Sequence, residues 1–348
     1  AAAHPPALPP AADRLVGFVN KPSLESELHA EAEAAANWLG GKGRLCLKYG
    51  APPFTVLDAR KGYWRDRRRW WQDKYRIHSE RGRGANLIGY QGLGGEGARG
   101  TSVFCPVLAE LCYKWWCPAR GCVLDPFAGG SVRGIVAGRL GLRYVGVELS
   151  GAQVAENQAQ ALEAEGIATA GGCRWQRPEW LHADARRLSE TEMNGAPRQV
   201  DFLFSCPPYY NLERYSTDPR DLSNAATFDD FLLSYRAIIA ASAGRLAPRR
   251  FACFVVGEIR HEDGWMRNLV GETVDAFAAA GCGLYNSAVM LLPLHTLPMR
   301  VAKQFNHSHK LGMSHQHVLV FYNGRQPDKE VPELSKKMSN AARPLEWR

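Results

Sequence analysis

The chain has 348 residues, of which 45% are hydrophobic and 22% charged, and its 43 Lys and Arg against 35 Asp and Glu give a formal charge of +8. This composition excludes a mostly disordered or collagen-like chain and predicts a sizeable core. The positive charge favours a polyanionic partner but does not prove one.

Membrane-spanning and secreted classes are not expected. No apolar run approaches the roughly 18 residues that a membrane-spanning helix needs, and the first residues lack the basic flank and apolar stretch of a secretory signal. We therefore expect a soluble cytoplasmic protein without a membrane partner.

The nine cysteines include no CxxC pair. We expect reduced thiols and no metal site, although Cys112, Cys117 and Cys122 are evenly spaced.

The N-terminal part divides by composition. Residues 1–22 begin with an Ala- and Pro-rich stretch and are expected to be a disordered leader. Residues 23–100 are expected to form a basic and aromatic extension, with a helix at 23–39. Its last part, residues 81–100, contains eight glycines among twenty residues and predicts a mobile loop.

The positive charge is concentrated within that extension. Residues 60–83 contain ten Lys or Arg and three acids, which supply +7 of the total +8. Clustered cations neutralise phosphates, and the interleaved aromatic rings could stack on bases. The alternative is a solvated helix with a Trp-lined packing face. The candidate nucleic-acid contacts here are Arg60, Lys61, Trp64, Arg65, Arg67, Arg68 and Arg69.

Beyond the glycine-rich loop, short apolar runs alternate with helical stretches. Such alternation predicts a mostly parallel sheet with helices on both faces. In this class, ligands bind at the carboxyl ends of the strands. The runs expected to be strands are residues 121–125, 142–149, 179–184, 200–206, 250–259, 284–292 and 315–322. The stretches expected to be helices are residues 131–141, 151–166, 228–246 and 265–281.

The first two strands end in residues suited to an adenosine-bearing cofactor. Asp125 opens a turn in which Gly129 and Gly130 let the backbone approach a ligand, and Glu148 can accept both hydroxyls of a ribose. The nicotinamide fingerprint GxGxxG is absent. A carboxylate at the turn repels phosphate and suits an ammonium, which favours S-adenosylmethionine (SAM). The alternative is a turn that merely joins strand to helix.

The fourth strand ends in SCPPYYN, residues 205–211. Two prolines remove two backbone donors and fix an extended turn, so carbonyl groups remain available to a substrate. Tyr209 and Tyr210 offer faces on which a base can stack. The alternative is a rigid strand exit capped by aromatic residues.

Together, DPFAGGS and DFLFSCPPYY resemble the SAM-dependent amino-methyltransferases of DNA. The stretches TSVFCPVLAEL, NLERYSTDPRDLSN and HKLGMSHQHVLVFYNG resemble phage and prophage DNA methyltransferases in particular. The resemblance covers roughly residues 50–324. It implies a Rossmann-like methyltransferase fold with a mostly parallel seven-stranded sheet, a catalytic domain over residues 101–324 and a C-terminal tail over residues 325–348.

The resemblance also implies which residues form the site. The catalytic tetrapeptide would be Cys206, Pro207, Pro208 and Tyr209, with Tyr210 among the nucleic-acid contacts. SAM would lie against Thr101, Ser102, Phe104, Asp125, Pro126, Phe127, Ala128, Gly129, Gly130, Ser131, Glu148, Leu149, Asp184 and Ala185. Two positions depart from the family: Ser131 replaces a glycine, and Cys206 replaces the Asp, Asn or Ser that accepts a hydrogen bond from the target amine.

The expected reaction is a direct methyl transfer to the exocyclic amine of adenine or cytosine in double-stranded DNA, with the target base flipped out of the duplex. No metal is required. A weakly accepting thiol at Cys206 leaves the target atom open, and a covalent role for Cys206 in carbon-5 methylation is an alternative. Two other functions stay open: an RNA base methyltransferase, and a DNA-binding module with a degenerate methyltransferase domain.

A second candidate partner surface lies near the C-terminus. It consists of His307, His309, His315 and His317 near Lys303 and Lys310. Four histidines could suggest a metal site. However, the alternation in HQHVLVF places His315 and His317 on one face of a strand, which favours ordinary positions in a sheet.

Overall fold

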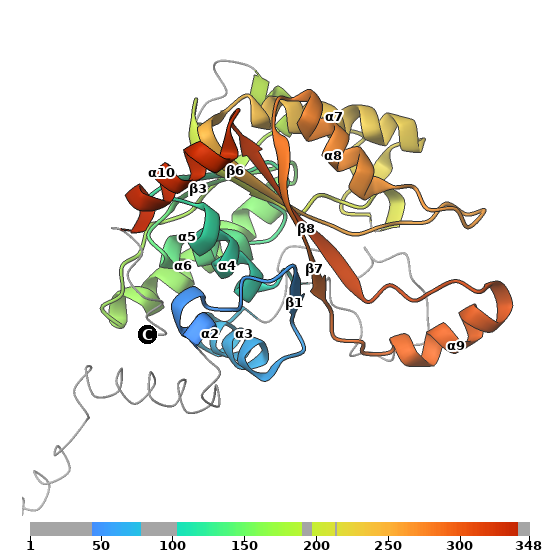
Figure 1. Ribbon diagram of the computed structural model, residues 1–348, viewed down its shortest axis with the longest axis horizontal. Helices are drawn as coiled ribbons and strands as arrows, with labels where there is room; N and C mark the ends of the chain where they lie inside the picture. The colour runs from blue at the N-terminus through green and yellow to red at the C-terminus, as the bar shows by residue number, and fades with distance from the viewer. Residues whose placement is uncertain (1–43, 78–102, 190–196, 213, 340–348) are drawn as a thin grey trace, which may run out of the picture.

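The computed structural model describes residues 44–77, 103–189, 197–212 and 214–339, which form one sheet with helices on both sides (Figure 1). The sheet has eight strands in the order β1-β7-β8-β6-β5-β2-β3-β4. All pair in parallel except β8, which is antiparallel to β6 and β7. The strands are β1 (Val56–Asp58), β2 (Cys122–Asp125), β3 (Arg143–Glu148), β4 (Glu179–His182), β5 (Val200–Ser205), β6 (Leu246–Val256), β7 (Gly283–Leu291) and β8 (His315–Asn323).

The expected mostly parallel, Rossmann-like α/β architecture is confirmed, and each of the seven expected strands is present. The sheet has eight strands rather than seven because β1, from the N-terminal extension, adds an edge by pairing with β7. Only three residues long, β1 is too short to produce an alternating pattern that a sequence could reveal.

The helices are α2 (Arg44–Tyr49), α3 (Gly62–Tyr75), α4 (Pro106–Trp116), α5 (Val132–Arg139), α6 (Gly151–Ala170), α7 (Phe228–Ala243), α8 (Leu269–Ala279), α9 (Leu297–Ser308) and α10 (Pro327–Ser339). Local signals fix some of the starts. Thr227 and Asp230 form a capping box that begins α7, and the Ser150 side chain caps α6. The segment expected to be a tail contains α10. Within the described residues, no helix combines the length and apolar character needed to span a bilayer.

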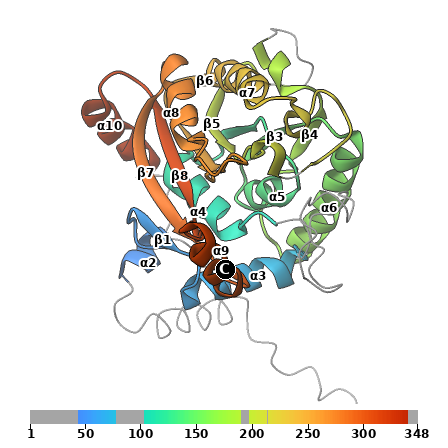
Figure 2. The ribbon, with the colours of Figure 1, turned by 90° about the vertical axis from the view of Figure 1, so that its right-hand side faces the viewer.

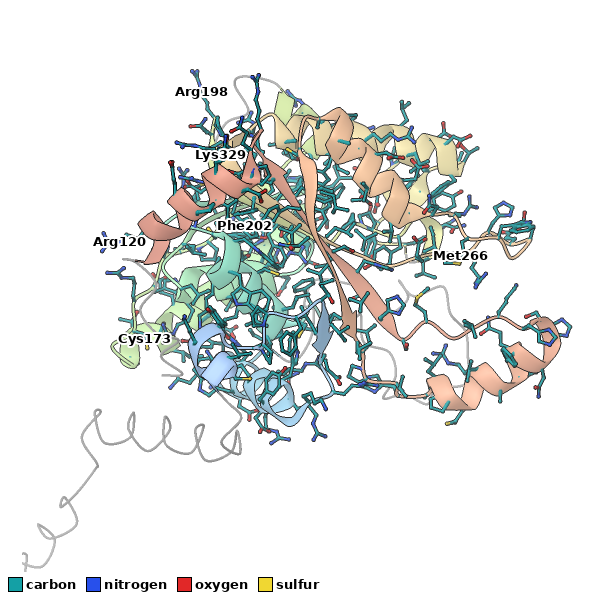
Figure 3. All side chains as sticks on the ribbon, in the orientation of Figure 1. Arg120, Cys173, Arg198, Phe202, Met266 and Lys329 are labelled. Atoms are coloured by element: carbon teal, nitrogen blue, oxygen red, sulfur yellow. The ribbon has the colours of Figure 1, made fainter. Side chains whose placement is uncertain are left out.

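Alternation along the strands divides the core into two layers. Phe202 and Phe204 of β5 face the layer under α3, α4, α5 and α6, whereas Leu203 between them faces the layer under α7 and α8. Because both faces are covered, the central strands are apolar on both sides. Phe202 lies near the centre of the molecule (Figure 3).

The described part of the N-terminal extension packs into the same core. Trp64, Trp71 and Tyr75, one above another along α3, are almost fully buried. Other parts of the extension and the leader, including the helix expected at residues 23–39 and the loop expected at 81–100, lie outside the described residues. Thus residues 44–77 contribute both an edge strand and a packed helix.

The order of strands creates a switch point. The chain moves from β2 outward to β3 and β4, and then returns to the other side of β2 with β5 and β6. The connections after β2 and β5 therefore diverge to opposite sides of the sheet and leave a crevice at their carboxyl ends. DPFAGG follows β2 and CPPYY follows β5, so the fold brings the two motifs to this crevice.

Candidate active site

A cavity of about 580 Å³ lies at the switch point. Its volume is within the range of pockets that bind small molecules. Many of the residues expected in the site line it: Arg68, Phe104, Pro126, Phe127, Gly129, Gly130, Glu148, Leu149, Asp184, Ala185, Cys206, Pro207, Pro208 and Tyr209. The fold therefore gathers the glycine turn, the acid after β3 and the Pro-Pro turn around one space.

Asp125 lies beneath the glycine turn rather than in the cavity. It is fully buried, and its carboxylate accepts hydrogen bonds from Arg133 Nε at 2.6 Å, Tyr144 Oη at 2.8 Å and the Ser205 hydroxyl. The expected direct contact of Asp125 with a cofactor amine is therefore wrong. Its carboxylate is enclosed by a network that joins β2, β3 and β5 to α5, so it supports the turn from below.

Arg133 changes the electrostatics that the sequence suggested for the turn. Burial alone would lower the pKa of its guanidinium, but the charge of Asp125 more than offsets this, and the pKa is raised. Arg133 also donates to the carbonyl oxygens of Phe127 and Ala128 at 2.7 and 2.9 Å. The turn is thus held by a compensated ion pair, and the argument that a lone carboxylate there repels phosphate does not hold.

Two further turn residues face inward. Ala128 is fully buried and packs against Gly146 of β3. A Cβ on residue 146 would lie 2.8 Å from the Cβ of Ala128, so β3 and the turn pack closely only because residue 146 is glycine. Ser131 is also buried and its hydroxyl donates to Gln160 of α6. The serine that replaces a glycine in the motif is accommodated by this bond, away from the cavity. Ala128 and Ser131, both expected near a cofactor, are not among the residues that line the cavity.

Glu148 is placed at the cavity wall by two backbone groups. Its Oε2 accepts from Gly129 N at 2.9 Å, and its Oε1 accepts from Ser150 N at 2.8 Å. Each carboxylate oxygen has further acceptor capacity, so a diol in the cavity could donate to both. This carboxylate, together with the backbone of Gly129 and Gly130 at the cavity wall, fits a ribose of an adenosine-bearing group such as SAM.

Asp184 lines the same side of the cavity. Burial would raise the pKa of its carboxyl, but hydrogen bonds from Arg186, one of them 2.5 Å long, lower it below the usual value. Ala185 begins a short 3₁₀ helix beside it. Thr101 and Ser102, the other expected cofactor contacts, lie outside the described residues, whereas Phe104 lines the cavity and packs edge-on against Phe204.

The Pro-Pro turn presents Cys206 and Tyr209 together. The Cys206 sulfur lies 3.6 Å from the Tyr209 hydroxyl, which also accepts a hydrogen bond from Gln316 Nε2 at 2.9 Å. Burial, and next the neighbouring Cys206, raise the pKa of Tyr209 well above its ordinary value. A Cβ on Gly257 would lie 3.3 Å from the Tyr209 ring. The ring is therefore positioned by β6 and β8 as well as by its own turn.

Tyr210 points the other way. It has a left-handed φ of 50°, which is unusual for a bulky residue and turns the chain sharply after Tyr209. Its ring is buried against Phe228 and Phe231, with centroids 5.6 and 5.7 Å away, and Arg267 lies over its face. The expected nucleic-acid contact of Tyr210 is wrong, because its ring belongs to the core.

The basic helix α3 is also divided by packing. Arg67 is buried in a bidentate ion pair with Glu110 of α4, at 2.8 and 2.9 Å, and Trp64 is fully buried. The expected contacts of Arg67 and Trp64 with nucleic acid are therefore wrong, and the alternative of a Trp-lined packing face applies to this side of the helix. Arg60 is exposed but paired with Asp58, whereas Lys61, Arg65 and Arg69 are exposed and Arg68 reaches the cavity.

Sequence reasoning missed several cavity and supporting residues. Gln316 lies between the two histidines of HQHVLVF, and no local pattern indicates that it reaches Tyr209, 107 positions away. Arg133 could have been noticed as a cation in the first turn of α5, next to the glycine turn. His315 and His317 do share a face of β8, as expected, with ring centroids 5.1 Å apart.

Comparisons with known proteins give structural but no sequence relatives. No protein-family model matches the sequence, and no curated protein matches it either. TrmN from Thermus thermophilus is similar in structure, with 16% identity and a TM-score of 0.38 over 63% of this chain and 49% of that one, so the chain spans about half of TrmN.

Two other solved structures are similar at the same level. Magnesium protoporphyrin IX methyltransferase from Synechocystis, solved with bound SAM, has 11% identity and a TM-score of 0.40 over 74% of this chain and 96% of that one. A candidate DNA modification methylase from Thermus thermophilus has 14% identity and a TM-score of 0.30 over 43% and 56%. Similarity this low carries no information about the substrate of this chain.

Proposed function

We propose that the chain is a SAM-dependent methyltransferase that modifies the exocyclic amine of adenine or cytosine in DNA. The observation that supports this most strongly is the meeting of DPFAGG and CPPY across one cavity, with the Glu148 carboxylate at its wall. Either turn alone has a plain structural explanation. Their meeting at the switch point, beside an acid able to bind a diol, does not follow from packing needs.

The residues of the cavity divide into two groups with different tasks. Glu148 accepts the ribose hydroxyls and the backbone at Gly129 and Gly130 lies against the rest of the cofactor. SAM, when bound, supplies an electrophilic methyl group on a sulfonium. On the opposite wall, Tyr209 stacks on the target base, which is flipped out of the duplex.

The Pro-Pro turn orients the target amine. The Cys206 sulfur and the Pro207 carbonyl accept hydrogen bonds from the two N–H groups of the amine, so its lone pair points toward the methyl group. Pro207 and Pro208 have no N–H that could compete for these acceptors. The amine would gain the methyl group and lose one proton to water, and the sulfur would keep the electron pair of the broken methyl–sulfur bond.

The experiment that tests this function is transfer of labelled methyl from SAM to duplex DNA, followed by identification of the modified nucleoside by mass spectrometry. N6-methyladenine or N4-methylcytosine is the expected product. The product 5-methylcytosine would contradict amine methylation and favour the covalent role of Cys206. Transfer to RNA alone would favour an RNA base methyltransferase, and SAM binding without any transfer would favour a DNA-binding module.

A pair of cysteine variants tests the site. Cys206→Ala should lower kcat about 10- to 100-fold, because the amine loses an orienting contact, and should leave cofactor affinity unchanged. The matched control is Cys173→Ala, a half-buried thiol after α6, outside the residues that line the cavity (Figure 3). Equal activity of both variants would contradict the assignment of Cys206.

A further inference from the structure

The connection between β7 and β8, residues 292–314, forms an arm that carries α9 and projects from the end of the sheet (Figures 1 and 2). None of the α9 residues is buried. The arm carries Arg300, Lys303 and Lys310 together with three histidines, and the sequence has no Asp or Glu between Asp275 and Asp328. Its charge is therefore entirely positive.

A few internal contacts give the arm its shape. A Cβ at Gly312 would lie 2.8 Å from Leu297 Cδ1 and 3.0 Å from Val301 Cγ2, so the returning chain packs closely on one face of α9. Phe305 packs edge-on against the ring of His309. On the outside, Met299 and Leu311 are 79% and 75% exposed. A helix that buries none of its residues and exposes large apolar side chains is typical of an interaction surface.

The arm begins at the cavity. Pro293 and His295 at its base line the cavity, as do Met290 and Gln316 at the ends of the two strands that hold it. A polymer whose target unit occupied the cavity would therefore run beside the arm.

The loop between β6 and α8 contacts the arm from the other side. A Cβ at Gly264 would lie 3.1 Å from Lys310 Nζ, so loop and arm touch there. The next residue, Trp265, is 77% exposed, and Met266 lies on the same side of the molecule as α9 (Figure 3). This loop also carries two exposed acids, Glu262 and Asp263, and Asp263 is 2.8 Å from His261 Nδ1.

We infer that the arm, residues 292–314, binds the sugar-phosphate backbone of duplex DNA next to the flipped base. This inference rests on the proposed function, because it takes DNA as the substrate. Charge favours a polyanion over a protein partner, because the arm has cations and no acid, and clustered cations neutralise phosphates. The helix α3, where Arg67 and Trp64 face the core, is the weaker candidate for this contact.

The test uses full-length protein and two triple variants with the same change in charge. The arm variant combines Arg300→Gln, Lys303→Gln and Lys310→Gln. The control variant combines Arg120→Gln, Arg198→Gln and Lys329→Gln, three exposed residues on the opposite side of the molecule in Figure 3. Binding to a fluorescent duplex is measured by anisotropy over a range of salt concentrations, and binding of S-adenosylhomocysteine by calorimetry.

If the arm binds phosphates, its variant should make the negative slope of log K against log salt shallower by about 2.7 and weaken duplex binding about tenfold or more. The control variant should bind as the wild type does, and both should bind S-adenosylhomocysteine normally. Equal losses in both triple variants, or no loss in the arm variant, would overturn the inference. Arm-dependent binding to RNA but not to duplex DNA would overturn it too.

The outcomes separate this inference from the proposed function. Arm-dependent DNA binding by a protein that transfers no methyl group supports the arm and contradicts the function. If the protein methylates DNA but the arm variant binds the duplex as tightly as the wild type does, the proposed function is supported and the role of the arm is contradicted.

Discussion

The ion pair between Glu110 and Arg67 gives the sharpest prediction about the N-terminal extension. The Glu110 carboxylate is 4% exposed and accepts four hydrogen bonds: two from Arg67, one from Trp71 Nε1 at 2.8 Å and one from Lys114 Nζ at 2.6 Å. Burial alone would raise the pKa of Glu110, but the charges of Arg67 and Lys114 hold it well below its usual range. This carboxylate therefore fastens α3 to α4.

Replacing Glu110 by Gln keeps the shape of the side chain and removes its charge. Arg67, whose side chain is 7% exposed, then loses its carboxylate partner while it stays buried, and the free energy of unfolding should fall by about 3–5 kcal/mol. Urea denaturation at pH 7 measures this loss. The double variant Glu110→Leu with Arg67→Met should recover part of it, because the buried cation of Arg67 is removed together with the carboxylate, while the Trp71 donor and the half-buried Lys114 ammonium lose their partner.

A surface pair provides the matched control. Arg177 and Glu165 are 2.6 Å apart, but the arginine is 60% exposed, so Glu165→Gln should cost less than about 1 kcal/mol. A loss for Glu110→Gln no larger than this would refute the reasoning. Because the folded pKa of Glu110 is lowered, its contribution is present above the unfolded value of about 4.3 and is lost as the pH falls below it. The free energy of unfolding of the Gln variant should therefore fall less than that of the wild type as the pH drops below this value.

Three further predictions concern the cavity and the sheet. Glu148→Gln should weaken S-adenosylhomocysteine binding about tenfold or more in calorimetry, since hydrogen bonds to a charged acceptor contribute about 1.5–3 kcal/mol each; unchanged affinity would exclude its role at the ribose. Gly257→Val should displace the Tyr209 ring and lower kcat about tenfold or more with cofactor affinity retained, whereas full turnover would show that the ring position is unimportant. Burial and next His315 lower the pKa of His317. Stability should therefore decline as the pH falls below about 6.5, because the unfolded chain binds the proton more readily, and His317→Gln should reduce this decline in denaturation curves; an identical decline would contradict the shift.

The strands and the two turns were readable from the sequence because their signals are local. Buried parallel strands produce continuous apolar runs, and glycines and prolines at their ends restrict the backbone within a few residues. For this reason the segments before Asp125, Glu148 and Cys206 were located within one or two residues of the observed strand ends. The three-residue strand β1 and the helix α9, which has no apolar face against the core, left no such signal.

The fate of individual charged and aromatic side chains could not be read in this way. Arg67 and Arg68 are neighbours of the same type, yet one pairs with Glu110 in the core and the other reaches the cavity. Tyr209 and Tyr210 likewise separate, one to the cavity and one to the core. The motif suggests Asp125 as a cofactor ligand, whereas its carboxylate accepts hydrogen bonds from Arg133, Tyr144 and Ser205.

The sequence by itself determined the α/β alternation, the two motif turns and the concentration of charge in residues 60–83. Only the tertiary structure decided which of those charges face the core and that the arm, residues 292–314, carries its cations beside the cavity. The physical reason is that the exposure of a charge depends on its partner, and the partner of Arg67 lies 43 positions away.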